Sequence, residues 1–205
     1  PSHPYSWPVI GSMEDLGAAS LEDVKDFFRT YYVPNNASLV IAGDFDAKET
    51  REWVKKYFGD IPKGNPGESV PPPQPSLADE KRETMEDRVQ LPRLYMSWHS
   101  TPLTGPDDAT LDILADVLAG GKNSRLFKAL VYEKQIAQSV FASQNSRALA
   151  GVFAVHVTAK PGYTLSEIEK VVDEEIEKLK NGTPAERELQ RSKNSTKANF
   201  IFRLQ

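Results

Sequence analysis

The chain has 205 residues, no cysteine and a formal charge of −4 at neutral pH. The lack of cysteine excludes disulfides, thiolate zinc sites and a cysteine nucleophile. The acidic balance argues against nucleic acid as a partner, because no basic stripe is present to neutralise phosphates. No apolar run approaches the roughly 20 residues that a membrane-spanning helix needs, so we expect no such segment.

Residues 1–62 are predicted to fold as helix, strand, helix. Residues 20–23, Ser-Leu-Glu-Asp, resemble a capping box that opens the first helix. Pro34 and the two asparagines after it end that helix. Residues 38–42 are an apolar run without alternation, which predicts a strand buried on both faces. Asp46 is expected to cap the next helix.

Residues 63–88 differ in composition from both of their neighbours. They contain a run of three prolines, several further Pro and Gly residues and then a charged stretch. Such a sequence sustains neither a helix nor a central strand, so it predicts an extended linker between domains. A proline motif that binds a partner is the alternative interpretation.

Residues 89–205 are predicted to form a second unit of strands and helices. An alternating strand over 93–99 precedes helices over 109–118 and 124–133. Two β runs, 136–144 and 152–158, are expected to pair as a hairpin. This order favours an α+β fold over a parallel doubly wound sheet.

Two capping boxes predict the last two helices of the second unit. Thr164 with Glu167 opens the first, and Thr183 with Glu186 opens the second. We expect the second helix to continue through Gln205 without a C-cap. On this interpretation the chain is a fragment, truncated at both ends.

The residues offer few candidates for chemistry. A metal site from His3, His99 and His156 is not favoured, because none of them has a partner at the spacing of a helical zinc motif. Residues 120–124, Gly-Gly-Lys-Asn-Ser, lack the first glycine and the hydroxyl residue after lysine that a phosphate loop needs. Six acids between 167 and 177 are interpreted as a solvated helix face: Glu167, Glu169, Asp173, Glu174, Glu175 and Glu177.

Four short motifs, in this order and spacing, resemble the zinc peptidases of the insulinase/pitrilysin (M16) family, which includes the mitochondrial processing peptidases. They are His3-Pro4-Tyr5, the Tyr-Tyr-Val-Pro-Asn-Asn-Ala junction of residues 31–37 with Gly43-Asp44, Ser-Arg-Leu-Phe at 124–127 and Ile-Ala-Gln-Ser-Val at 136–140. The inverted zinc motif of that family, H-x-x-E-H, is absent from the 205 residues.

The resemblance implies a LuxS/M16-metallopeptidase-like α/β sandwich, with an antiparallel sheet and helices packed on one face. Residues 1–62 would be the end of the first half of a family member, and 63–88 the linker. Residues 89–205 would be most of the second, inactive half. Zinc is implied for the parent protein, whereas no catalytic, metal-binding or cofactor-binding residue is expected in this segment.

A substrate clamp of the family falls within the second unit. Clamping members carry an arginine followed seven residues later by a tyrosine, and alignment on residues 136–140 places Val131 and Gln138 at those positions. Valine has no donor, and glutamine has no phenol to polarise a scissile carbonyl. Tyr132 is one position away, which on a helix directs it about 100° from the required side.

Our leading hypothesis is that the parent is a bacterial M16-type zinc endopeptidase subunit that acts on peptides or unfolded polypeptides. This segment alone is predicted to be inactive, and a second M16-like subunit, in a homodimer or a heterodimer, could supply the clamp. A non-catalytic M16-like structural or substrate-presenting subunit is one alternative, and an unrelated α+β ligand-binding module is another. The resemblance favours the bacterial periplasm over the cytoplasm.

Overall fold

The structure is a computed structural model that describes residues 3–67 and 76–204. The chain divides into two compact units, Pro1–Pro73 and Gln74–Gln205. The division falls within residues 63–88, the stretch predicted to be a linker. Within the described residues no helix is long and apolar enough to cross a membrane.

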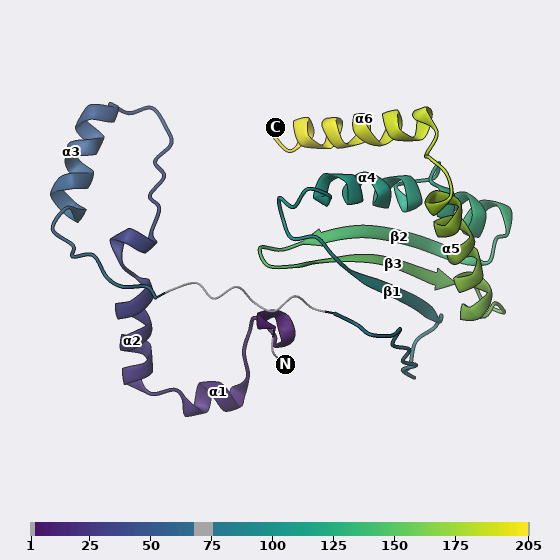
Figure 1. Cartoon of the computed structure of the whole chain (residues 1–205), viewed down its shortest axis with the longest axis horizontal. Helices are drawn as coiled ribbons and strands as arrows, with labels where there is room; N and C mark the ends of the chain where they lie inside the picture. The colour runs from purple at the N-terminus through teal and green to yellow at the C-terminus, as the bar shows by residue number, and fades with distance from the viewer. Residues whose placement is uncertain (1–2, 68–75, 205) are drawn as a thin grey trace. The chain divides into compact units, whose positions relative to one another are not determined.

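The first unit consists of short helices whose N-termini are capped by side chains. Ser20 and Asp23 form the predicted capping box of α2, and the Asp46 carboxylate accepts a hydrogen bond of 2.8 Å from the Glu49 backbone N–H at the start of α3. The elements, shown in Figure 1, are η1 (Pro4–Ser6), α1 (Met13–Ala18), α2 (Leu21–Tyr31), η2 (Pro34–Asn36) and α3 (Ala47–Phe58).

The predicted strand over residues 38–42 is wrong for this chain. These residues belong to no helix or sheet, and Val40 is 85% exposed. A strand needs a neighbour to take its backbone hydrogen bonds, and the described part of the first unit contains no strand that could pair with it. For the same reason none of the described residues of this unit is buried.

The asparagines of the 31–37 junction hold the loop after α2. The Asn35 side chain makes two hydrogen bonds of 3.0 Å with Gly64, donating to its carbonyl oxygen and accepting from its N–H. Asn36 donates to the Tyr31 carbonyl at 2.9 Å and so satisfies one of the free carbonyls at the end of α2. A Cβ atom on Gly64 would lie 2.3 Å from a Val33 methyl, so this approach requires glycine.

The second unit is an antiparallel sheet with helices on one face, which confirms the predicted α+β class. The strands follow the order β1-β3-β2, so β2 and β3 form the predicted hairpin and β1 pairs with β3. The elements are β1 (Arg93–Ser100), α4 (Asp108–Ala119), the π-helix η3 (Phe127–Glu133), β2 (Ala137–Ser146), β3 (Gly151–Ala159), α5 (Leu165–Lys180) and α6 (Glu186–Phe202).

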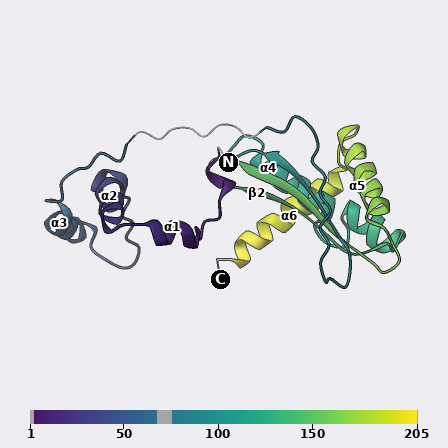
Figure 2. The ribbon, with the colours of Figure 1, turned by 90° about the horizontal axis from the view of Figure 1, so that it is seen from below.

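The hydrophobic core lies between the sheet and the helices. Alternate β3 residues, among them Val155 and Val157, are buried against α4, α5 and η3. Helix α5 supplies Ile168, Val171 and Val172, which recur at helical spacing along one of its faces. Helix α6 forms an outer layer on α4, as Figure 1 and Figure 2 show, with Ser192 fully buried.

Three helix predictions in this unit need correction. The helix expected over 124–133 is present, but residues 127–133 have π-helical hydrogen bonding. Helix α6 begins at Glu186 rather than at Thr183, because Glu188 accepts a hydrogen bond of 2.9 Å from the Ala185 N–H and closes the cap two residues later. It ends at Phe202 with Arg203 as its C-cap, whereas a helix without a C-cap was expected; Gln205 itself lies outside the described residues.

Candidate functional site

The two histidines of the second unit are not opposite one another in the sheet. His99 and His156 lie on the same face of the sheet, on neighbouring strands, but His99 is opposite Val152 while His156 is opposite Tyr95. The Nδ1 atom of His3, in the first unit, accepts a hydrogen bond of 3.1 Å from the Tyr5 N–H. Across residues 3–67 and 76–204, no three His, Asp or Glu side chains are grouped so that they could hold a metal ion. These donors therefore do not fit zinc.

The glycine-rich segment 120–124 is a turn between helices, as its sequence indicates. Gly121 has a φ of +82°, a conformation that favours glycine, and the Ser124 hydroxyl donates to the Gly121 carbonyl at 2.6 Å. Arg191 of α6 donates to the Asn123 carbonyl at 2.8 Å. The loop polar groups are thus used to hold the turn against α6.

The acidic face of α5 is solvated only in part, because Glu175 is buried and the Glu169 side chain is 18% exposed. Glu177 pairs with Lys180 at 2.6 Å on the surface, and Glu169 pairs with the exposed Arg82. Glu175, however, is only 9% exposed and accepts a 2.5 Å hydrogen bond from Lys178. The prediction of a wholly solvated face was wrong there, because the side of α5 that carries Glu175 lies against neighbouring elements.

A partly buried ion pair that the sequence did not reveal connects the 124–127 motif to α6. Arg125 donates from Nε and Nη2 to the two carboxylate oxygens of Glu188, at 2.9 and 2.7 Å. This hydrogen bonding holds the pKa of Glu188 at about 2, far below its ordinary value. Leu126, the next residue of the motif, is fully buried in the core. The motif therefore has a structural role.

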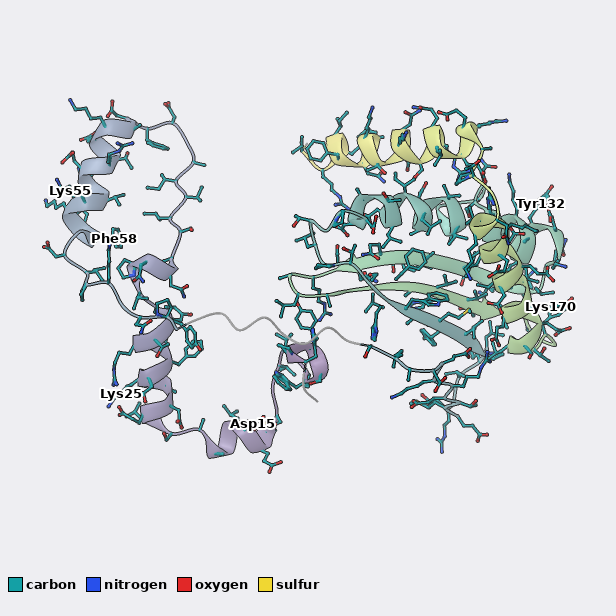
Figure 3. The ribbon with its side chains drawn as sticks, in the orientation of Figure 1. Asp15, Lys25, Lys55, Phe58, Tyr132 and Lys170 are labelled. Atoms are coloured by element: carbon teal, nitrogen blue, oxygen red, sulfur yellow. The ribbon has the colours of Figure 1, made fainter. Side chains whose placement is uncertain are left out.

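The two clamp positions lie on either side of the short loop between η3 and β2, and the backbone is irregular at both of them. Val131 is in the π-helix η3 and packs against the core, whereas Gln138 is exposed at a register shift between Ala137 and Ser139 of β2. Such bulges re-aim a side chain, and π-helical turns are often found at functional sites. Tyr132, labelled in Figure 3, is 76% exposed.

Gln135, between the two clamp positions, has a φ of +54°. We expect Gln135→Gly to be neutral or to stabilise the chain by up to about 1 kcal/mol, because glycine adopts this conformation without steric cost but loses more entropy on folding. Gln135→Val should instead destabilise it by about 1–2 kcal/mol. Urea unfolding of both variants checks this, and equal midpoints for the two would contradict it.

One face of the sheet is left open by the helices of its own unit, so far as the described residues show. Tyr95 is 60% exposed on it and Phe141 57%. Strand register sets out four rows of three side chains across β1, β3 and β2: Arg93–Thr158–Ser139, Tyr95–His156–Phe141, Ser97–Ala154–Ser143 and His99–Val152–Asn145. We call these twelve residues the open face; Ala154 is buried, and the other eleven are exposed or half-buried.

Aromatic rings make up the second row of the open face. The His156 ring packs edge-on to Tyr95 at 4.8 Å between centroids and lies 6.3 Å from Phe141. Arg93 is held beside this row by two hydrogen bonds, from Nε to the Thr158 hydroxyl at 3.1 Å and from Nη1 to the Tyr95 hydroxyl at 3.2 Å. The open face therefore offers rings and a positioned cation side by side.

Comparison with known proteins identifies the family. The model of the peptidase M16 inactive domain matches residues 18–196. The zinc protease PqqE of Helicobacter pylori is 30% identical over 207 residues, which cover 99% of this chain and 46% of that protein. The chain spans about half the length of the curated relatives it matches first, at 46–49% of each.

Solved structures agree with this assignment. The crystal structure of a protease from Helicobacter pylori has a TM-score of 0.71 at 30% sequence identity and covers 97% of this chain and 49% of that one. The peptidase M16 inactive domain from Pseudomonas fluorescens has a TM-score of 0.77 at 21% identity, covering 98% and 48%. The hypothesis of an unrelated ligand-binding module is therefore wrong: the chain belongs to the peptidase M16 family and carries its inactive domain.

Proposed function

We propose that this chain is the non-catalytic part of a longer zinc-dependent peptidase, in which it helps to enclose a peptide or an unfolded polypeptide. The observation that carries the proposal is the match of residues 18–196 to the inactive domain of a peptidase family. The relative named a zinc protease, identical at 30% of positions, supports zinc in the longer protein. Residues outside this chain would hold that metal, because the described residues offer no group that fits it.

We further propose that the longer protein works with a second M16-like subunit. The two positions that would form the clamp are occupied by Val131, which has no donor, and Gln138, which has a neutral amide in place of the phenol. A partner that carries both residues would complete the site.

We propose the bacterial periplasm as the compartment of the longer protein. Cell fractionation with an antibody against this chain tests this proposal.

The experiment compares the 205-residue chain with the full-length protein that contains it. Full-length protein is expected to hold about one zinc ion per polypeptide and to cleave an unfolded casein substrate in a chelator-sensitive manner, alone or with the partner subunit. The chain alone is expected to hold no stoichiometric zinc and to release no peptide. Elemental analysis and a fluorescent casein assay measure these outcomes.

Two results would overturn the proposal. Stoichiometric zinc with hydrolysis by the 205-residue chain would show that the chain is itself catalytic. Full-length protein that holds no zinc and cleaves nothing, with or without its partner, would instead favour a structural or substrate-presenting subunit.

A further inference from the structure

The charge of the open face differs from that of the chain. The chain has 29 Asp and Glu residues against 25 Lys and Arg, yet none of the twelve open-face residues is acidic. Two of the three histidines and one arginine lie on this face: His99, His156 and Arg93. With histidine counted as neutral, Arg93 is the one formal charge among these twelve residues, so this face favours a carboxylate over a cation.

Arg93 is a cation positioned without an anion. Its two hydrogen bonds run to neutral hydroxyl groups, of Thr158 and Tyr95, which fix the guanidinium beside the aromatic row. Among residues 3–67 and 76–204 it joins no salt bridge, and its Nη2 atom has no hydrogen-bond partner. A fixed arginine with free donors is suited to bind a carboxylate.

The spacing of the rows matches that of an extended peptide. Alternate residues of a strand are about 7 Å apart, so the Arg93 row and the Tyr95–His156–Phe141 row are separated by that distance along β1. A peptide that lies extended along the strand direction presents alternate side chains downward at the same interval. One such side chain can reach Arg93 while the side chain two residues further along the peptide stacks on the rings.

We propose that the open face binds an extended polypeptide segment in which a carboxylate side chain and an aromatic side chain are two residues apart. The carboxylate pairs with Arg93, and the aromatic ring packs against Phe141, His156 and Tyr95. The inference rests on the proposed function, since it defines the class of polypeptide that the enclosed site prefers.

The test measures peptide binding to the 205-residue chain by fluorescence anisotropy. The probe is a labelled twelve-residue peptide with Phe-x-Glu-x-Phe at its centre and Gly and Ser elsewhere. Because a Phe lies two residues from the Glu on both sides, the peptide can bind in either chain direction. Two matched peptides replace the Glu by Lys or both Phe residues by Ser. We expect the first peptide to bind at least about fivefold more tightly than either of the others, with an affinity that falls as salt rises.

Variants assign the preference to particular side chains. Arg93→Gln should weaken binding of the Glu peptide about fivefold and abolish its advantage over the Lys peptide. Phe141→Ala should weaken both Phe-containing peptides about fivefold. Arg187→Gln is the matched control, because Arg187 is exposed on α6, in the helix layer beyond α4, and should leave binding unchanged. Far-ultraviolet circular dichroism verifies that each variant is folded.

The outcomes separate this inference from the proposed function. Equal binding of the Glu and Lys peptides, or equal effects of Arg93→Gln and Arg187→Gln, would overturn the inference even if full-length protein is an active zinc peptidase. Self-association of the chain that Phe141→Ala abolishes would also overturn it, since a second copy would then cover the open face. The expected preferences in this chain, with full-length protein lacking zinc and activity, would overturn the proposed function alone.

Discussion

Leu130→Ala is expected to lower the free energy of unfolding of the second unit by about 3 kcal/mol. Leu130 lies in the π-helix η3 and is fully buried in the core. Its removal leaves a cavity between the sheet and the helices, because the close-packed neighbours can collapse only in part. The Leu130 carbonyl also accepts the Ile136 N–H at 2.9 Å, so repacking here disturbs the connection that carries both clamp positions.

Urea unfolding followed by Trp98 fluorescence measures this loss. All variants carry Trp7→Phe and Trp53→Phe, so that the fluorescence comes from the second unit alone. There the centroids of the Trp98 ring and the buried Phe153 ring are 6.1 Å apart. Tyr132→Ala is the matched control, since its side chain projects into solvent from the same π-helix (Figure 3) and should cost less than about 0.5 kcal/mol. Similar losses for both variants would show that the site relaxes without a cavity.

The parts of the fold that were predicted correctly are those in which a local pattern coincides with a buried face. In α5 the apolar positions recur at helical spacing, and Ile168, Val171 and Val172 are indeed in the core. The capping box of Thr164 and Glu167 also formed where the sequence placed it, because all its partners lie within four residues.

Failures occurred where the deciding partner is distant in the chain. Residues 38–42 have the composition of a buried strand, but composition does not supply the neighbouring strand that its backbone requires. The start of α6 depends on Glu188, and Glu188 is fixed by Arg125, 63 residues earlier. No local spacing reveals that pair.

The candidate site, too, could be predicted from the sequence only in part. Alternation along 93–99 was visible in the sequence, and it places Arg93, Tyr95 and His99 on one face once the strand exists. The cross-strand row of Tyr95, His156 and Phe141 depends on strand register, and its Tyr95–His156 pair joins residues 61 positions apart in the chain. Register is set by core packing and by the bulge at Gln138, which the sequence alone did not show.

The second large effect concerns the Arg125–Glu188 pair. Glu188→Gln is expected to lower the free energy of unfolding by about 2 kcal/mol at pH 7. The substitution keeps an oxygen to accept the Ala185 N–H but removes the charge that pairs with Arg125, whose side chain is only 19% exposed. The uncompensated guanidinium is then left partly buried between the 124–127 turn and α6.

The difference in free energy of unfolding between the unsubstituted chain and Glu188→Gln should depend on pH in a definite direction. The folded pKa of Glu188, about 2, lies below its ordinary value of 4.5, so the carboxylate stabilises the fold when ionised. The stabilisation is fully present above about pH 5 and is lost as the pH falls toward 2. Urea unfolding at pH 7, 5, 3 and 2 should therefore show a difference that shrinks to near zero at the lowest pH.

Glu177→Gln is the control for this series, because Glu177 pairs with Lys180 on the exposed surface of α5. Its effect should stay within about 0.5 kcal/mol at every pH, as exposed pairs contribute little. A difference for Glu188→Gln that is unchanged between pH 7 and pH 2 would mean that the glutamate acts through packing rather than through its charge. A difference that is present at pH 7 and disappears toward pH 2 instead assigns the attachment of α6 to one ion pair, and with it the role of the arginine in the Ser-Arg-Leu-Phe motif.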